Sequence, residues 1–261
     1  MILKEITART FANRWKRKTY DHKLPSLSRL VVLKWRQFRV ETIGGYNFRG
    51  QERDFVQRAY DGMGQHTFEI INGAQDWVNW RQIPRAMRGR IPEGAALIVD
   101  LGCGPGSSTR IIAWHGAPSW RIIGMDFSED LIRQARHRVE SGGFSTASGK
   151  QPAVEFVVGS VVEPFRDASG TELADLSVDY VNSSGIVGHH LSRESFTSLA
   201  TELRRVVKPH GFVSLDSGPH LKGGIIRSVM ERFGFVLRTK VRSVPLDPRP
   251  QLVFQKEDMG G

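Results

Sequence analysis

Residues 97–109 read Leu-Ile-Val-Asp-Leu-Gly-Cys-Gly-Pro-Gly-Ser-Ser-Thr, an apolar run that leads through an acid into three closely spaced glycines. The apolar run predicts a short buried strand of a parallel sheet, because both faces of such a strand are covered. The glycines allow a sharp turn and let bare backbone approach a ligand. We expect a helix over 107–113 with Ser107 or Ser108 as its N-cap. Together these parts predict a nucleotide-type pocket at the carboxyl edge of a sheet.

The glycine spacing separates this turn from two phosphate-binding motifs. The dinucleotide fingerprint Gly-x-Gly-x-x-Gly would place its third glycine at Ser107, and the lysine of a P-loop is missing. The carboxylate of Asp100 would repel a pyrophosphate and favours a cationic ligand. An ordinary glycine-rich turn between strand and helix is the alternative interpretation. The stretch resembles motif I of class I S-adenosylmethionine-dependent methyltransferases, written Asp-x-Gly-x-Gly-x-Gly.

What this resemblance implies is a set of cofactor-binding residues in the turn. It assigns contacts with S-adenosylmethionine to five of them: Asp100, Gly102, Cys103, Gly104 and Gly106. Cys103 is the only cysteine of the chain, and we interpret it as a small packing residue in preference to a nucleophile. No metal site is predicted.

A second acid ends an apolar strand further along the chain. Residues 121–125 form this run, and Asp126 follows about twenty residues beyond the glycine turn, where a Rossmann-like sheet places an acid that binds ribose hydroxyls. Ser128 is the expected N-cap of the next helix. The sequence Gly-Met-Asp-Phe-Ser is similar to the second conserved block of the same family, which implies cofactor contacts for Asp126 and Phe127. The alternative is that Asp126 is only a turn residue at a strand end.

Two more strands are predicted, over 153–158 and 178–182. After the first of them the family usually carries an aspartate that accepts a hydrogen bond from the adenine amine. Ser160 stands there in this chain, and its hydroxyl is a weaker acceptor than a carboxylate. The resemblance implies that Ser160, Val161 and Ser183 contact the cofactor.

The loop after the fourth strand carries His189 and His190. In the family this loop lies at the catalytic mouth. Methyl transfer from a sulfonium is an in-line substitution, so orientation of the acceptor is the main requirement, and a base is needed only for a protonated acceptor such as a hydroxyl. His189 and His190 are the candidate bases, with a rate expected to rise through roughly pH 6–7. Alternatively, they cap the loop or pack on the cofactor.

The remaining elements complete the order expected for the family. We predict a helix over 193–207, a stop over 208–211, a strand over 212–215, a helix over 225–233, and strands over 235–241 and 251–255. The resemblance runs from about residue 91 to residue 256, and the chain is identified as a member of the class I methyltransferases. This implies an α/β, Rossmann-like, doubly wound seven-stranded sheet with an antiparallel closing strand, preceded by an N-terminal helical region.

The organisation expected from these patterns has three parts: a basic N-terminal arm over 1–46, a helical lid region over 47–90, and the methyltransferase domain over 91–261. Aromatic and aliphatic spacings predict two or three helices in the lid region, with Pro84 and Pro92 between it and the domain. Four of its residues are candidates for lining the pocket: Tyr60, Gln65, His66 and Trp77.

Charge is concentrated at the start of the chain. Residues 1–40 contain eleven lysines or arginines and two acids, so they hold +9 of the formal net charge of +10. Such an arm suits contact with nucleic acid, an anionic membrane surface or an acidic partner. A solvated, partly disordered extension is the alternative.

Composition and missing signals limit the function classes. A hydrophobic fraction of 39% supports a packed core. One cysteine, no membrane-length apolar run and no secretory signal predict a reducing, cytoplasmic location.

A small-molecule acceptor is the leading hypothesis, because Asn-Ser-Ser-Gly ends the fourth strand where amino-methylating nucleic-acid enzymes carry Asp/Asn-Pro-Pro-Tyr/Phe. An RNA or protein methyltransferase guided by the basic arm, and a non-catalytic cofactor-binding protein, remain alternatives. The oligomeric state is left open.

Overall fold

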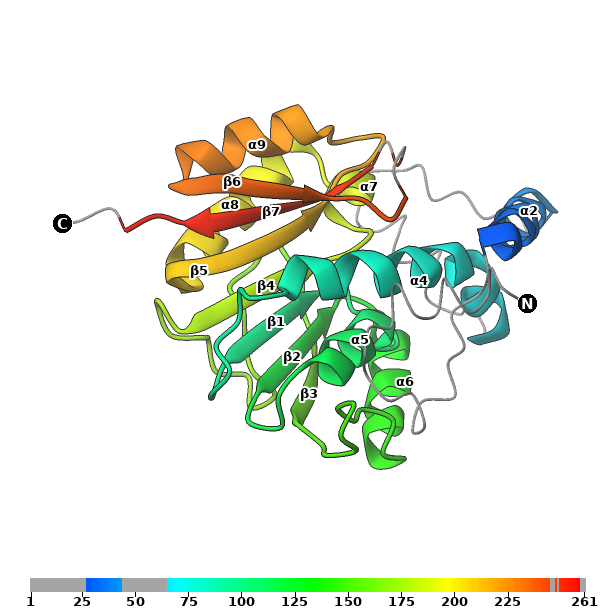
Figure 1. The fold of residues 1–261 in the computed structure, drawn as a ribbon, viewed down its shortest axis with the longest axis horizontal. Helices are drawn as coiled ribbons and strands as arrows, with labels where there is room; N and C mark the ends of the chain where they lie inside the picture. Colours follow the sequence, from blue (N-terminus) through cyan, green and yellow to red (C-terminus); the bar gives the residue numbers. More distant parts are fainter. Residues whose placement is uncertain (1–26, 44–64, 245–246, 248, 259–261) are drawn as a thin grey trace.

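The structure is a computed structural model that describes residues 27–43, 65–244, 247 and 249–258 (Figure 1). Its centre is a seven-stranded sheet of order β3-β2-β1-β4-β5-β7-β6. Strands β1 to β5 pair in parallel, and β7 is antiparallel to both β5 and β6. The strands are β1 (Leu97–Leu101), β2 (Arg121–Asp126), β3 (Ala153–Val158), β4 (Val178–Ser183), β5 (Val207–Asp216), β6 (Phe235–Val241) and β7 (Gln251–Lys256). This confirms the predicted sheet with its antiparallel closing strand.

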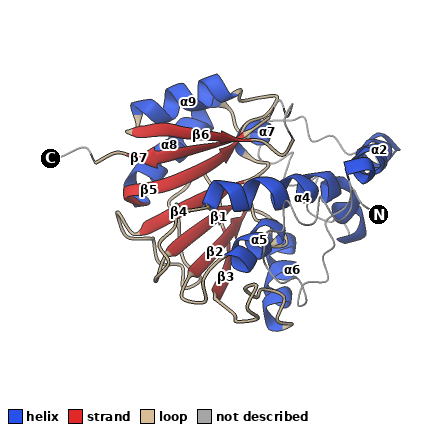
Figure 2. Ribbon diagram, viewed as in Figure 1, coloured by secondary structure: helices blue, strands red, loops and turns tan. Residues whose placement is uncertain are grey.

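Helices cover both faces of the sheet (Figure 2). The described helices are α2 (Leu27–Ile43), α4 (Gln65–Met87), α5 (Ser107–His115), α6 (Glu129–Glu140), α7 (Val187–His190), α8 (Arg193–Val206) and α9 (Gly223–Arg232). Successive residues of β1 point to opposite faces. Ile98 packs in the core cluster of α4, α5 and α6, whereas Val99 and Leu101 pack in the cluster of α8 and α9. The doubly wound arrangement is therefore confirmed.

The start of α5 differs from the prediction. Its N-cap is Gly106, in the left-handed region with φ 86°, and both Ser107 and Ser108 lie inside the helix. The hydroxyl of Ser108 donates to the carboxylate of Asp100 at 2.7 Å and is therefore not used as a cap. Ser128, in contrast, is the N-cap of α6, and its hydroxyl accepts from the amide of Leu131.

The helix ends before 208–211 as predicted, but these residues lie inside β5, so the prediction that the strand begins at residue 212 was wrong. Helix α8 ends at Val206, and β5 begins at the next residue. The partners of Val178 and Tyr180 in β5 are Val207 and Phe212, so the strand register shifts between them and accommodates the four residues. His210 takes a φ of 62° in this bulge.

The lid region contains one long helix in its described part. Helix α4 runs for 23 residues, and Pro84 lies inside its last turn, where we expected punctuation before the domain. Residues 44–64 lie outside the described part, so the number of helices predicted there stays open. Helix α2 occupies 27–43, within the predicted basic arm, and packs beside α4 at one end of the molecule (Figure 1).

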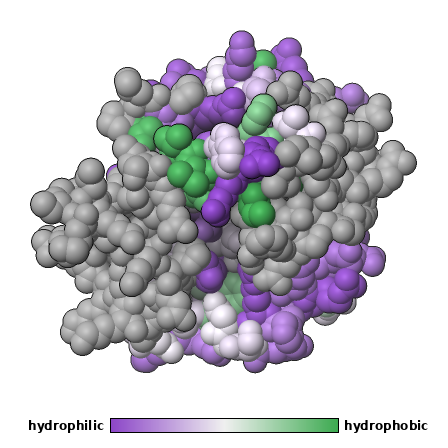
Figure 3. All heavy atoms as spheres, turned by 90° about the vertical axis from the view of Figure 1, so that its right-hand side faces the viewer, coloured by the Kyte–Doolittle hydropathy of each residue, from purple (hydrophilic) through white to green (hydrophobic). Residues whose placement is uncertain are grey.

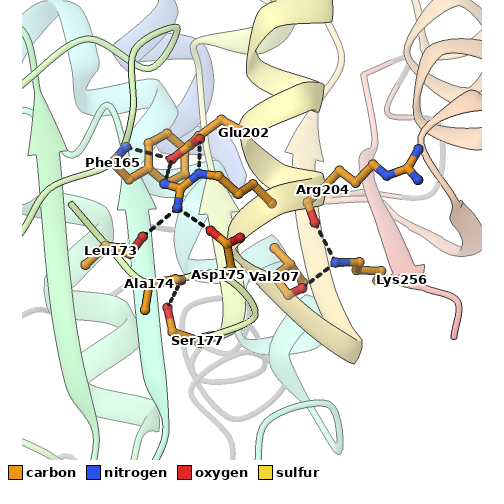
Figure 4. A network of polar contacts seen from close by, with 10 residues as sticks. Phe165, Leu173, Ala174, Asp175, Ser177, Glu202, Arg204, Val207 and Lys256 are labelled. Carbon is orange, nitrogen blue, oxygen red and sulfur yellow. Dashed lines mark hydrogen bonds and ion pairs between the residues drawn. The ribbon is translucent and has the colours of Figure 1, made fainter. Parts of the chain in front are cut away.

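A partly buried ion pair ties the connection between β3 and β4 to α8 (Figure 4). Glu202 accepts the amide of Phe165 at 2.8 Å and the guanidinium of Arg205. Arg205 also donates to the carbonyl of Leu173 at 2.7 Å and to Asp175 at 2.8 Å. The connection that follows Ser160 is thus held against the sheet. Among the helices that the structure describes, none is long and apolar enough to cross a membrane.

Candidate cofactor and acceptor cavity

A cavity of about 1250 Å³ lies at the carboxyl ends of β1, β2, β4 and β5, where α2 and α4 also line it. The parallel strands bring together six predicted site residues in its wall: Gly102, Gly104, Asp126, Phe127, His189 and His190. The other six predicted site residues do not line it: Asp100, Cys103, Gly106, Ser160, Val161 and Ser183. Figure 3 shows hydrophobic and hydrophilic side chains lying side by side on this end of the molecule.

The glycine turn brings the end of β1 close to β2. The amide of Gly102 donates to the carbonyl of Met125 at 2.7 Å. Both Gly102 and Gly104 have positive φ, 62° and 52°. A Cβ atom on Gly102 would lie 1.5 Å from Cδ1 of Ile186, so the turn has no room for a side chain at this position. The turn presents its backbone to the cavity, as the sequence predicts.

Asp126 faces the cavity from the end of β2. One carboxylate oxygen accepts the amide of Gly104 at 2.9 Å, and the other accepts the amide of Ser128 at 3.0 Å. A carboxylate has about four acceptor positions, so one such group can accept from several donors at once. The carboxylate of Asp126 therefore links the glycine turn to the start of α6, and Asp126 also lines the cavity.

The carboxylate of Asp100 stabilises the turn through hydrogen bonds. Its side chain is fully buried and accepts from the hydroxyls of Ser108 and Thr109 at 2.7 and 2.6 Å. Asn182 of β4 donates to the other oxygen at 2.7 Å. Burial raises the pKa of Asp100, and the three hydrogen bonds oppose this rise. Asp100 joins β1, α5 and β4; contact with a cationic ligand stays a prediction.

Cys103 is a packing residue in this geometry. Burial, followed by the charge of Asp126, raises the pKa of its thiol well above the usual value. The thiolate is the reactive form of cysteine, so a raised pKa makes the sulfur unreactive. A Cβ atom on Gly124 would lie 3.0 Å from the Sγ of Cys103, so the sulfur is packed closely against this glycine.

Three predicted cofactor contacts, Ser160, Val161 and Ser183, do not line the cavity. The hydroxyl of Ser160 accepts from the amide of Val162 at 3.4 Å. The hydroxyl of Ser183 donates to Asp216 at 3.1 Å. Their cofactor contacts stay predictions, and Val161 packs against the hydrophobic core.

Asp216 is a cavity residue that sequence reasoning missed. It ends β5 and accepts the amides of Ile186, Val187 and Gly188, at 3.2, 3.1 and 3.0 Å. These amides open the short helix α7, whose unpaired N–H groups need acceptors. The signal was present, because Asp216 follows an apolar run in the same way as Asp100 and Asp126 do.

His189 and His190 enter the cavity on α7, with ring centroids 6.3 Å apart. Burial is the main cause that lowers the pKa of His189, and the cations Arg249 and Lys34 lower it further. Burial and the neighbouring His189 lower the pKa of His190 to about 4. Both rings are therefore neutral at pH 7, and a neutral imidazole has one nitrogen that accepts a proton.

Helix α7 packs closely against the segment after β5 through two glycines, a contact that no local sequence pattern predicts. A Cβ on Gly188 would lie 2.0 Å from the amide nitrogen of Gly218. The carbonyl of Gly188 accepts the amide of His220 at 3.1 Å. The histidine loop therefore lies directly on the segment that follows β5.

Helix α4 lines the cavity with residues other than those predicted. Trp77 is buried beneath the guanidinium of Arg81, which lies 3.3 Å from the ring centroid. Tyr60 and the side chains of Gln65 and His66 lie outside the described residues. The lining from α4 is Ile71, Asn72, Gln75, Val78 and Gln82.

Similarity to known proteins points to one family. Residues 98–211 match the family model described as a methyltransferase domain. The chain is 46% identical over 54 residues to trans-aconitate 2-methyltransferase from Afipia carboxidovorans, which is 21% of each protein. It is 30% identical over 141 residues to demethylmenaquinone methyltransferase from Bacillus subtilis, 53% of this chain and 52% of that protein. The matches span about half or less of these relatives.

The fold is shared with solved structures. Magnesium protoporphyrin IX methyltransferase from Synechocystis PCC 6803, solved with bound S-adenosylmethionine, superposes with a TM-score of 0.52 at 19% identity. The superposition covers 85% of this chain and 97% of that protein. At this identity the likeness concerns the fold.

Proposed function

Because the chain belongs to the class I S-adenosylmethionine-dependent methyltransferases through its domain at residues 98–211, we propose that it methylates a small molecule. The acceptor would bind in the cavity between the glycine turn and α7. The single observation that carries the proposal is that one cavity joins Asp126 to His189 and His190. One cavity therefore contains both the expected cofactor-binding edge and the candidate bases.

The glycine-turn end of the cavity has the features that suit S-adenosylmethionine. Backbone of Gly102 and Gly104 lines this end of the cavity, and Asp126 offers carboxylate oxygens beside it. We infer that Asp126 accepts hydrogen bonds from the ribose hydroxyls and that Phe127 packs beside them. When bound, the cofactor supplies a methyl group on a good leaving group.

Room for an acceptor follows from the size of the cavity. Ligand pockets of roughly 300–1,000 Å³ hold a molecule of drug size, and this cavity measures about 1250 Å³. It therefore suits a cofactor together with a small second molecule. Leu30, Lys34 and Phe38 of α2 border it, so a large acceptor would have to pass this helix.

The histidines would serve an acceptor that loses a proton. A neutral imidazole accepts that proton as the new bond to carbon forms, and a base works best when its pKa is near the working pH. His189 is the better candidate, because the pKa of His190 falls to about 4. Asp216 positions both rings through the amides of α7.

The names of two relatives support a small acceptor, whereas a third protein, 27% identical over 157 residues, is named a release factor glutamine methyltransferase. Trans-aconitate is a small carboxylic acid and demethylmenaquinone a quinone, and each is named as the substrate of a protein that resembles part of this chain. Neither name fixes the acceptor here.

Binding measurements test the two halves of the proposal separately. Calorimetry with S-adenosylhomocysteine should give a one-to-one complex of the full chain. A metabolite panel is then screened by thermal shift with and without this product. A small molecule that raises the melting temperature only in its presence supports the proposal. Stabilisation by RNA or a protein substrate, with none of the metabolites acting, contradicts it.

A further inference from the structure

The outer side of α2 carries large hydrophobic side chains that are exposed to solvent. Val31, Trp35 and Phe38 have exposed fractions of 72%, 56% and 64%, and Val32 has 47%. The spacing of the first three residues is i, i+4 and i+7, which places them on one stripe of a helix. Apolar surface of this kind on one helix face marks an interaction site more often than scattered exposed residues do.

The opposite side of α2 is the one that holds it to the protein. Cδ2 of Leu33 lies 3.2 Å from the position that a Cβ on Gly73 of α4 would take, so the two helices approach closely there. Leu30 points into the cavity wall. Because these inward residues anchor the helix, the apolar stripe remains available on the outside.

Cations flank the stripe. Lys34, Arg36 and Arg39 are exposed, and residues 30–39 contain no acid. The guanidinium of Arg39 lies over the ring of Trp35, 4.9 Å from its centroid. Residues 30–39 therefore carry a formal charge of +3, which attracts anions.

We propose that α2 docks on an anionic lipid surface. Its apolar stripe enters the boundary between headgroups and acyl chains, and the flanking cations bind the headgroups. An interfacial helix needs this combination of an apolar face with a tryptophan or phenylalanine and a cationic polar face. Each lysine or arginine near an anionic surface adds to the attraction.

The aliphatic members of the stripe favour lipid over the other occupants. A single-stranded nucleic acid would stack on Trp35 and Phe38 but would gain little from Val31 and Val32. A second copy of the chain would bring two sets of cations together. An apolar phase with negative headgroups satisfies both the aliphatic residues and the cations.

Docking would also orient the cavity. Lys34 and Phe38 belong both to the exposed part of α2 and to the cavity wall. A lipid surface bound to α2 therefore lies beside the cavity. This inference concerns binding and does not depend on methyl transfer.

Co-sedimentation of the full chain with vesicles tests the proposal. We expect binding to vesicles of phosphatidylserine and phosphatidylcholine, and little binding to phosphatidylcholine alone. The variant Val31→Gln/Trp35→Gln removes apolar surface, and glutamine is a good helix former that keeps α2 helical. The variant Arg36→Gln/Arg39→Gln removes two charges. Each variant should bind at least roughly tenfold more weakly. None of these four residues lines the cavity.

Matched controls separate the docking face from general effects. Val139→Gln/Ile225→Gln replaces two exposed apolar residues on α6 and α9, and Arg232→Gln/Lys240→Gln removes two exposed charges. Both controls should bind like the unaltered chain. Unweakened binding of the Val31→Gln/Trp35→Gln variant would overturn the proposal, because charge alone would then hold the chain. Binding to RNA without binding to vesicles would overturn it as well.

Insertion of the stripe has a spectroscopic signature. Trp77, Trp80, Trp114 and Trp120 are buried, so in a Trp15→Phe chain Trp35 is the remaining exposed tryptophan. Lipids brominated in the acyl chain should quench its fluorescence. Unquenched fluorescence in sedimented protein would place α2 outside the bilayer and contradict the proposal.

Discussion

The carboxylate of Asp216 accepts the backbone amide of Gly188 at 3.0 Å. Through this bond the end of β5 holds the first turn of α7, the helix that carries His189 and His190. Asp216 also lines the cavity, as do Gly102 and Gly104 of the glycine turn. The position of the candidate bases therefore depends on a residue more than twenty positions away in the chain.

Replacement of Asp216 by Ala should loosen α7. Several amides and the hydroxyl of Ser183 would lose their charged acceptor, and such bonds contribute roughly 1.5–3 kcal/mol each. We expect urea denaturation to show a loss of at least about 2 kcal/mol. Asp258→Ala, at an exposed position near the end of the described chain, is the control. Equal stability of the two variants would mean that α7 does not depend on Asp216.

Substitution of Gly102 by Ala should destabilise the chain by more than backbone strain alone. Gly89 provides the comparison, because its φ of 66° is close to the 62° of Gly102 but no atom lies within 4 Å of its added Cβ. Strain of about 1–2 kcal/mol is common to both variants. Thermal unfolding should show the larger loss for Gly102→Ala, with partial recovery when Ile186→Ala removes the clash. Equal losses in the two glycine variants would argue against the tight turn.

Protonation of His190 should destabilise the fold. Its pKa is about 4 in the folded chain, below the ordinary value of 6.5, so the unfolded chain binds the proton more readily. The stabilising contribution of the neutral ring is complete above pH 6.5 and is lost as the pH falls toward 4. Urea midpoints measured at pH 7 and pH 5 should therefore differ less in His190→Gln than in the unaltered chain. His137→Gln, at an exposed histidine of α6, should keep the full difference.

The pH dependence of methyl transfer should reflect the lowered pKa of His189. The sequence alone suggested a rise through roughly pH 6–7, the range of an unperturbed histidine. Burial moves the pKa of His189 down, so the rate should be nearly flat from pH 7 to 8 and fall only in more acidic solution. His189→Gln should lower turnover by about a hundredfold with a hydroxyl acceptor. Unchanged turnover would assign His189 to packing.

Cofactor affinity should depend on the carboxylate of Asp126. Asp126→Ala removes charge-assisted hydrogen bonds of roughly 1.5–3 kcal/mol, so calorimetry with S-adenosylhomocysteine should show at least about tenfold weaker binding. Asp167→Ala, on an exposed loop outside the cavity, should bind normally. Unaltered affinity of the Asp126 variant would remove this residue from the site.

The sequence predicted the parts of the fold that depend on local patterns. The apolar runs located β3 and β6 at the bounds that the structure has, and acids at strand ends marked Asp100 and Asp126. The bulge of β5 could not be foreseen, because Lys208 and Pro209 look like a helix stop. Only the pairing of β5 with β4 shows that these residues belong to the strand.

Within the site, the residues that escaped prediction act across long sequence separations. The contact of Gly188 with Gly218 and the bonds of Asp216 to α7 join segments about thirty residues apart. A glycine in a loop has many possible reasons, so neither partner could be recognised alone. The orientation of the buried Asp100 side chain likewise depends on a residue of another strand, because Asn182 of β4 donates a hydrogen bond to its carboxylate.

The most direct test of the account is transfer of a labelled methyl group. The full chain is incubated with S-adenosylmethionine labelled in its methyl group and with a cell extract separated into small molecules, RNA and protein. The account predicts label in the small-molecule fraction, and about a hundredfold less with His189→Gln if the acceptor is a hydroxyl. Label found in RNA or protein, with the small-molecule fraction unlabelled, would contradict the central claim.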